Sequence, residues 1–150
     1  MTPLLGDHFP PRFREDFCKK HLIRGAALRA WAEETTPPKI KLFVVWGIEE
    51  SLNKIAISFI NSEITSIKQQ SLRALQCPLL SKNNSFLTND SFLDCSRIYE
   101  KDLEKVRDLL MKDTEVYLGN ISSEDLSVAE RIIRNAPTIE IKLKKRYGLI

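Results

Sequence analysis

The densest run of hydrophobic residues lies at positions 40–46, where aliphatic and aromatic side chains follow one another almost without a polar break. Such β-branched and aromatic residues favour a strand, and near-continuous apolarity indicates burial on both faces. Gly47 ends the run, a short polar stretch follows, and residues 54–60 return with the alternation of a second strand. Because the connection is too short for a parallel crossover, the two segments predict an antiparallel hairpin.

Helical spacing of apolar side chains predicts three amphipathic helices, at residues 12–21, 101–111 and 122–136. The third begins with Ser122 and Asp125, a spacing that resembles a capping box with Asp in place of Glu or Gln. Pro137 ends this helix, because proline cannot donate the next backbone hydrogen bond. Residues 65–76 favour only a helical turn or two, and for residues 26–31 the periodicity leaves helix and strand open.

Three further strands are predicted, at residues 92–99, 116–118 and 138–145. In the last of these segments apolar and polar side chains alternate strictly, which predicts a half-exposed strand with a largely basic outer face. Lys142 and Lys144 are among its expected outward side chains.

Short turns between the strands, with helices inserted late, favour an α+β fold: a small, strongly curved antiparallel β-sheet or barrel with helices packed against it. At 150 residues the chain suits one domain. We expect residues 1–23 to form an N-terminal arm with a short helix, and residues 24–150 to form the sheet or barrel with its inserted helices.

Composition narrows the functional classes only a little. The chain is 43% hydrophobic and 29% charged, which is ordinary for a globular protein. Its longest apolar run is far too short to cross a membrane, and its first residues lack the basic and apolar regions of a signal peptide. Three cysteines without a Cys-x-x-Cys unit favour a reducing compartment, so we expect a cytoplasmic protein with no membrane association.

No standard catalytic motif is present, and the cysteines and histidines lack the spacing of a metal site. His8 and His21 are expected to pack rather than to act as bases, Cys95 to be a small buried residue, and Asp90 and Asp94 to serve turns or hydrogen bonds. The formal charge of +3 is mild. Local clusters of lysine are most simply solvated strand faces, with nucleic-acid contact as the alternative.

The order of several short segments carries more information than any single motif. A glycine at position 25 precedes the segment to residue 31, and a Thr-Thr-Pro-Pro loop at residues 35–38 leads into the apolar strand. The next strand then ends near a small hydroxyl residue, Ser62.

The most specific segment is residues 90–98, Asp-Ser-Phe-Leu-Asp-Cys-Ser-Arg-Ile, a strand that opens with serine and ends in isoleucine. Residues 119–126 then give a glycine turn and serines before the last amphipathic helix. In this order, over about residues 24–136, the chain resembles the MazF/PemK-like family of bacterial toxins. The resemblance implies an SH3-like β-barrel with inserted helices, and for active members a ribonuclease that needs no metal.

The resemblance also implies candidate site residues. Active members carry an arginine beside the proline that precedes the apolar strand, and a threonine or serine at the end of the following strand. That arginine is missing here, and only lysines stand nearby; lysine holds a phosphate but lacks the bidentate fork of a guanidinium. Tyr99 stands where the family often has a second arginine. The candidate catalytic residues are Lys41 and Ser62, and the candidate RNA-binding residues are Lys39, Arg97, Lys142 and Lys144.

Two functions follow as hypotheses. The first is a metal-independent endoribonuclease that acts on single-stranded RNA, forms a homodimer, is regulated by an antitoxin protein and requires no cofactor. The second is a non-catalytic module that keeps the same fold and binds nucleic acid or a protein through its basic residues.

Overall fold

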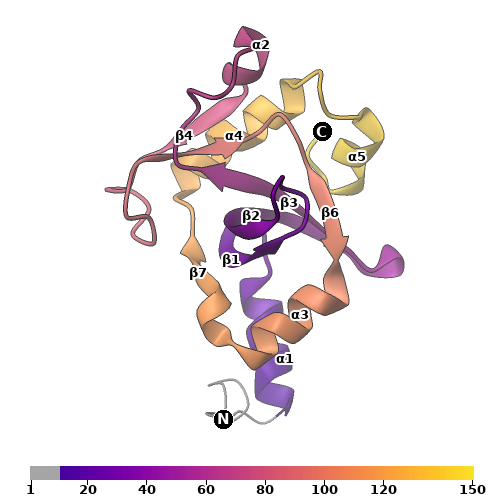
Figure 1. Ribbon diagram of the computed structural model, residues 1–150. Helices are drawn as coiled ribbons and strands as arrows, with labels where there is room; N and C mark the ends of the chain where they lie inside the picture. The colour runs from indigo at the N-terminus through magenta and orange to yellow at the C-terminus, as the bar shows by residue number, and fades with distance from the viewer. Residues whose placement is uncertain (1–10) are drawn as a thin grey trace.

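The hairpin predicted from the apolar run is the centre of the fold (Figure 1). The computed structural model describes residues 11–150. In it, β2 (Lys39–Glu49) and β3 (Lys54–Asn61) pair antiparallel, with Leu42 opposite Ile60, and the register shifts between Val45 and Gly47. The hairpin prediction is therefore confirmed, and both strands extend slightly beyond their predicted ends.

Five more strands complete a single antiparallel sheet with the order β4-β5-β3-β2-β1-β7, while β6 pairs with β3 outside this path. Their bounds are β1 Ala26–Ala32, β4 Gln76–Leu79, β5 Ser91–Asp94, β6 Tyr99–Asp102 and β7 Tyr117–Asn120. The segment left open between helix and strand is thus a strand, β1. The α+β class is confirmed, but within residues 11–150 the strand pairings leave the sheet open, so they do not form a closed barrel.

Helices cover both faces of the sheet. They are α1 Pro11–His21, α2 Gln70–Arg73, α3 Leu103–Lys112, α4 Ser123–Asn135 and α5 Ile141–Arg146. The pair α1 and α3 packs together on one side, and α4 and α5 lie at the other end of the molecule (Figure 1). The three amphipathic helices are confirmed, and the Ser122 hydroxyl accepts the Asp125 N–H at 3.1 Å as an N-cap.

Two hydrophobic cores result, one on each face of the central hairpin. Phe43, Val45 and Phe59 face the core that includes residues of α1 and α3. Val44 and Trp46 face the core that includes residues of α4 and the C-terminal segment. Successive residues of a strand point to opposite faces, so an unbroken apolar strand requires a cover on each side.

The predicted strand at residues 138–145 is wrong, because most of this segment is helix α5. Leu143 of α5 packs against the core, and Ile139 and Tyr147, which flank the helix, are buried in it. Ile141, expected to point inward, is 59% exposed. The local alternation predicted a strand, and contact with the core selects the helix instead.

Lys144 was expected on an outer strand face, and this expectation is also wrong. The side chain is 4% exposed, and its Nζ donates hydrogen bonds to the carbonyls of Arg134 (3.1 Å) and Ala136 (2.8 Å). These carbonyls lie at the C-terminal end of α4, where backbone acceptors lack helical partners and a cation is favourable. Lys144 thus ties α5 to the end of α4.

The predicted strand at residues 92–99 is only partly confirmed: β5 ends at Asp94, residues 95–98 form a turn, and β6 begins at Tyr99. The Asp94 carboxylate accepts the Ser96 N–H at 3.0 Å, which is a local turn that interrupts the ladder. Both pieces pair with β3: β5 with Ile60 and Asn61, and β6 with residues 54–57. The turn therefore lets β5 and β6 pair with the two ends of β3.

A buried chain of hydrogen bonds links the hairpin to this turn. The indole N–H of Trp46 donates to the Ser58 hydroxyl at 2.8 Å, and that hydroxyl donates to the Arg97 carbonyl at 2.7 Å. Trp46 and Ser58 are both fully buried. A buried indole N–H without a partner is costly, so Ser58 is the polar residue that the core tolerates for this purpose.

We therefore expect Ser58→Ala to lower the free energy of unfolding by about 1–3 kcal/mol, because it leaves the Trp46 N–H unpaired in the core. Urea denaturation followed by tryptophan fluorescence measures the change. Ser127→Ala, at an exposed position of α4, is the matched control and should stay within about 0.5 kcal/mol of the native protein. Equal stability of the two variants would contradict the role assigned to Ser58.

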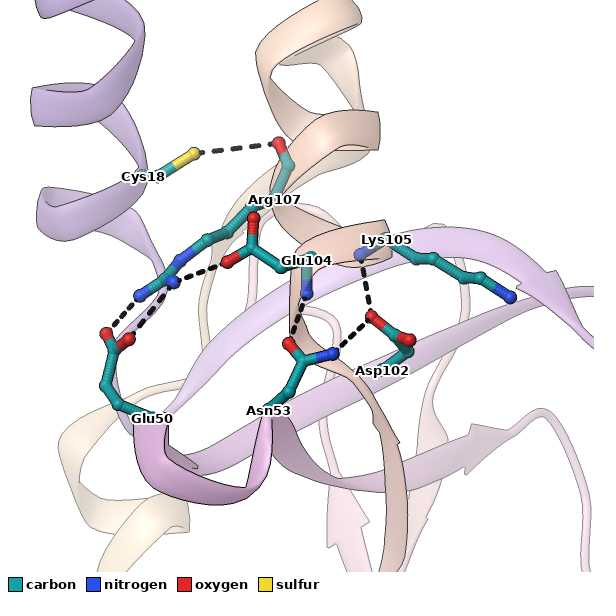
Figure 2. Close-up of polar contacts among 7 residues, drawn as sticks. All are labelled: Cys18, Glu50, Asn53, Asp102, Glu104, Lys105 and Arg107. Carbon is teal, nitrogen blue, oxygen red and sulfur yellow. Dashed lines mark hydrogen bonds and ion pairs between the residues drawn. The ribbon is translucent and has the colours of Figure 1, made fainter.

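The turn between β2 and β3 is fastened to the start of α3 (Figure 2). After the short 3₁₀ helix Glu50–Leu52, Asn53 adopts a left-handed conformation with φ of 51°. Its amide donates to Asp102 at 3.0 Å and accepts the Glu104 N–H at 3.0 Å. Asp102 in turn accepts the Lys105 N–H at 3.1 Å, so the first N–H groups of α3 find acceptors.

An ion-pair cluster continues this attachment (Figure 2). The Arg107 guanidinium binds the Glu50 carboxylate through two nitrogens and also contacts Glu104 at 2.9 Å. The side-chain hydrogen bond to Arg107 is the main reason that the pKa of Glu50 lies below its ordinary value. The cluster holds α3 against the hairpin turn, away from the open end of the hairpin.

Substitutions at Asn53 should separate its two roles. Asn53→Ala removes the side-chain hydrogen bonds to Asp102 and Glu104 and strains a left-handed backbone, so we expect a loss of about 1–2 kcal/mol in unfolding free energy. Asn53→Gly loses only the side-chain hydrogen bonds, since glycine adopts positive φ freely. Its unfolding free energy should therefore lie between those of the native protein and Asn53→Ala. Chemical denaturation of the three proteins tests this order; an alanine variant as stable as the native protein would refute it.

Candidate nucleic-acid interface

A groove of about 450 Å³ brings together three of the residues proposed from the sequence. Lys39 and Lys41 line it from the start of β2, and Ser62 lines it just after the end of β3. Arg29, from β1, is a third cation in the lining. The groove therefore lies at the open end of the central hairpin, where β2 begins and β3 ends.

Strand register brings the three cations to the same end of the sheet, with Arg29 on the face of Leu42 and the two lysines on the opposite face. Arg29 pairs with Leu42, and Leu42 pairs with Ile60 on the other side, so these positions follow one another across three strands. Lys41 pairs with Ala30 of β1. Alternation along β2 sends Lys39 and Lys41 to the same face, two residues apart.

Lys41 is the most constrained of these cations. Its Nζ donates to the Asn61 side-chain oxygen at 2.5 Å. Partial burial lowers the pKa of Lys41 below its ordinary value of 10.5, and the positive charge of Lys39 lowers this pKa further, whereas Asp94 acts in the opposite sense. A lysine in this state gives up its proton more readily than a solvated one.

Ser62 shares the groove with Lys41, but the hydrogen bond of the Lys41 ammonium goes to Asn61 rather than to Ser62. Neighbouring residues at the end of a strand point in different directions, which accounts for this separation. The Ser62 side chain is exposed, so its hydroxyl is accessible to a ligand in the groove.

The rest of the lining is neutral. It comprises apolar side chains and polar uncharged ones, and among residues 11–150 no carboxylate is part of it. The lining residues beyond the cations and Ser62 include Ile60, Phe86, Leu87, Thr88, Asn89 and Ser91. Three cations beside neutral polar groups form a surface suited to an anion that also carries uncharged polar parts.

The other predicted RNA-binding residues do not join this groove. Arg97 and Lys142 line a separate cleft of about 360 Å³ together with Glu100, Glu140 and Arg146. The Arg97 guanidinium lies 4.5 Å from the centre of the Tyr99 ring. Because two carboxylates line this cleft, it offers less net positive charge than the groove at the hairpin end. Lys144 contributes to neither, because it is buried.

Sequence reasoning missed Arg29, Asn61 and the segment 86–89. Arg29 lies in the segment whose secondary structure was undecided, so its neighbours across the sheet were unknown. Asn61 directly precedes Ser62, and the alternation of β3 was a usable signal that it shares a face with Phe59 and not with Ile60. Residues 86–89 precede β5, and the pairing of β5 with β3 brings them to the same groove as the lysines.

The remaining candidates behave as structural residues. Cys18, Cys77 and Cys95 are buried free thiols, and burial raises the pKa of Cys77 to about 11 and that of Cys95 further. Asp90 accepts two hydrogen bonds from Ser81. His21 packs against Phe17 and Tyr117, whereas His8 lies outside the described residues.

Residues 11–150 contain neither a metal-ligand cluster nor a membrane-spanning helix. No group of three or more His, Cys, Asp or Glu side chains in this range is arranged to hold a metal ion. Among the helices described, none combines the length and apolarity needed to cross a membrane.

Comparison with known proteins adds no relative: the sequence matches no family model and no curated protein.

The pKa of Lys41 is directly testable by NMR titration of its side-chain carbon and nitrogen. We expect it to titrate below 10.5, and Lys39→Ala to move its pKa upward because a neighbouring positive charge is removed. Lys112→Ala, at an exposed position at the end of α3, should leave it unchanged.

The lowered pKa of Lys41 also determines the direction in which the unfolding free energy changes with pH. The folded state disfavours the protonated lysine, so the contribution of Lys41 to unfolding free energy rises with pH between its lowered pKa and 10.5. Titration of Lys41 at its ordinary value in the native protein would contradict the burial and the repulsion described here.

Proposed function

We propose that this chain binds single-stranded RNA in the groove at the hairpin end and cleaves it without a metal ion, as a divergent MazF/PemK-like ribonuclease. The observation that carries the proposal is the convergence of Arg29, Lys39 and Lys41 on a groove without a carboxylate in its described lining. Phosphate groups supply most of the affinity in protein–nucleic acid contacts, and lysine and arginine are their usual partners.

The arrangement also supports a specific chemistry. In the cleavage of RNA, the 2′-oxygen forms a bond to phosphorus, the bond to the 5′-oxygen breaks, and a cyclic phosphate and a 5′-hydroxyl result. In its unprotonated form, Lys41 accepts the 2′-hydroxyl proton, and the resulting ammonium can return a proton to the leaving 5′-oxygen. Lys39 and Arg29 stabilise the charge on the phosphorane, and Ser62 donates a hydrogen bond to a phosphate oxygen.

The pKa of Lys41 is shifted downward, which is the direction that a general base requires. Asn61 holds the Lys41 side chain in place through the 2.5 Å hydrogen bond. A base held in this way is worth more than a mobile one, since its position is set before the substrate arrives.

The fold-level part of the proposal concerns the relation to SH3-like barrels. An antiparallel sheet with helices inserted between its later strands is compatible with an opened form of such a barrel. A homodimer, a protein antitoxin as partner and a cytoplasmic location belong to the same proposal, and they rest on the resemblance of the sequence.

A second candidate function is RNA binding without cleavage. The observation in its favour is that neither a carboxylate nor an imidazole lines the groove in the described part of the chain, so Lys41 is its main candidate base. In this alternative Lys41, held by Asn61, serves only as a phosphate contact.

Incubation of the purified protein with a mixed-sequence single-stranded RNA in excess EDTA tests the proposal. We expect discrete fragments with cyclic phosphate ends, and a loss of rate of about 10²–10⁴-fold in Lys41→Ala, since it removes the proton-transfer group. Ser62→Ala should lower the rate as well. The matched controls Lys112→Ala and Ser127→Ala should cleave like the native protein.

The other possible results distinguish the two functions or refute them. Intact RNA that is nevertheless bound, with binding weakened by Lys39→Ala and Lys41→Ala, supports the non-catalytic module. Neither binding nor cleavage at low salt would refute both functions. Cleavage that persists in Lys41→Ala would remove this lysine from the mechanism.

A further inference from the structure

The loop between β4 and β5 supplies a distinct part of the groove. It runs over residues 80–90, and Phe86, Leu87, Thr88 and Asn89 belong to the groove lining. The neutral side chains of this loop therefore face the same space as the cations of β1 and β2.

Hydrogen bonds close the loop at its base. The Asp90 carboxylate accepts the Ser81 N–H at 2.8 Å and the Ser81 hydroxyl at 3.0 Å, which joins the two ends of the loop. Within it, the Leu87 N–H donates to the Asn84 carbonyl at 2.9 Å. Local hydrogen bonds of this kind give a loop a defined shape without regular secondary structure.

Asn84 fastens the loop to the body of the protein. Its side chain is 1% exposed; the amide nitrogen donates to Leu80 (3.0 Å) and Asp125 (2.9 Å), and the amide oxygen accepts the Ser122 N–H at 2.9 Å. Ser122 and Asp125 belong to the N-terminal end of α4. A buried amide with three satisfied hydrogen bonds holds the loop in one position relative to that helix.

The groove-lining side chains of the loop divide into anchors and accessible groups. Leu87 is 8% exposed and belongs to the core, and half-buried Phe86 packs against that core near Gly119. Thr88 and Asn89 are exposed, and they contact each other only through a long hydrogen bond of 3.4 Å. Their polar groups are thus held at the groove by the anchors beside them.

We propose that residues 86–89 read the identity of a nucleobase, with the Asn89 amide and the Thr88 hydroxyl as the specificity-determining groups; this inference rests on the proposed RNA binding. An amide offers both a donor and an acceptor to a base edge, and an aromatic side chain offers a surface on which an unpaired base can stack. The cations hold the phosphates, which carry no sequence information. The loop therefore adds the choice of base to an otherwise general binding site.

The test measures binding of the full chain to four labelled oligonucleotides, each of a single base, by fluorescence anisotropy in EDTA. The 2′-O-methyl form of each probe prevents cleavage from consuming it. We expect the native protein to prefer one base by about tenfold, the discrimination that one good amide–base contact gives. Asn89→Ala should abolish this preference, and Thr88→Val should weaken it.

Two other variants separate base reading from general binding. Asn83→Ala, which alters an exposed asparagine of the same loop outside the groove lining, should keep both affinity and preference. Lys39→Ala should lower the affinity for all four probes by similar factors. Thermal melting of each variant, expected to match the native protein at these exposed positions, shows that the fold is retained.

The outcomes are distinguishable. A base preference that survives in both Asn89→Ala and Thr88→Val overturns the inference and leaves RNA binding intact. Equal affinity of the native protein for all four probes does the same. Failure of the native protein to bind any probe overturns the proposed function and this inference together.

Discussion

Burial of both faces of the β2–β3 hairpin is the constraint on which the rest of the structure depends. Every residue from Ile55 to Ile60 of β3 is buried, so neither side of the strand can meet water. Two separate cores satisfy this demand, one with α1 and α3 and the other with α4 and the C-terminal segment. The helices are therefore divided between the two sides of the hairpin, since each side requires a cover.

The same constraint explains where the groove lies. The hairpin turn is occupied by Asn53 and the Arg107 cluster, which bind it to α3 (Figure 2). At the opposite end of the hairpin, apolar residues give way to Lys39, Lys41 and Asn61, and neither core extends over them. Lys41 is partly desolvated there because it adjoins the buried part of β2, and this position lowers its pKa. Its electrostatic state is thus a product of its place at the edge of the core.

Charge is distributed unevenly between this end and the rest of the molecule. In the described part of the chain, the ion pairs join Arg24, Lys101, Arg107 and Arg146 to glutamates, and none of them includes Arg29, Lys39 or Lys41. Paired cations stabilise contacts between elements, whereas cations without a carboxylate at this distance are available to an external anion. The loop fastened by Asn84 adds neutral polar groups to the same groove.

The sequence by itself determined the hairpin, the three longer helices and the Ser122 cap, because these depend on local periodicity, turn length and the chemistry of a few adjacent residues. It also singled out Lys39, Lys41 and Ser62, which the fold brings to one groove. Only the tertiary structure decided that residues 26–32 form a strand, that residues 141–146 form a helix and that Lys144 is buried. Those outcomes, like the approach of Arg29 and residues 86–89 to the lysines, depend on packing between distant segments. Packing resolves the ambiguous period of residues 26–31 and overrides the local alternation of residues 138–145.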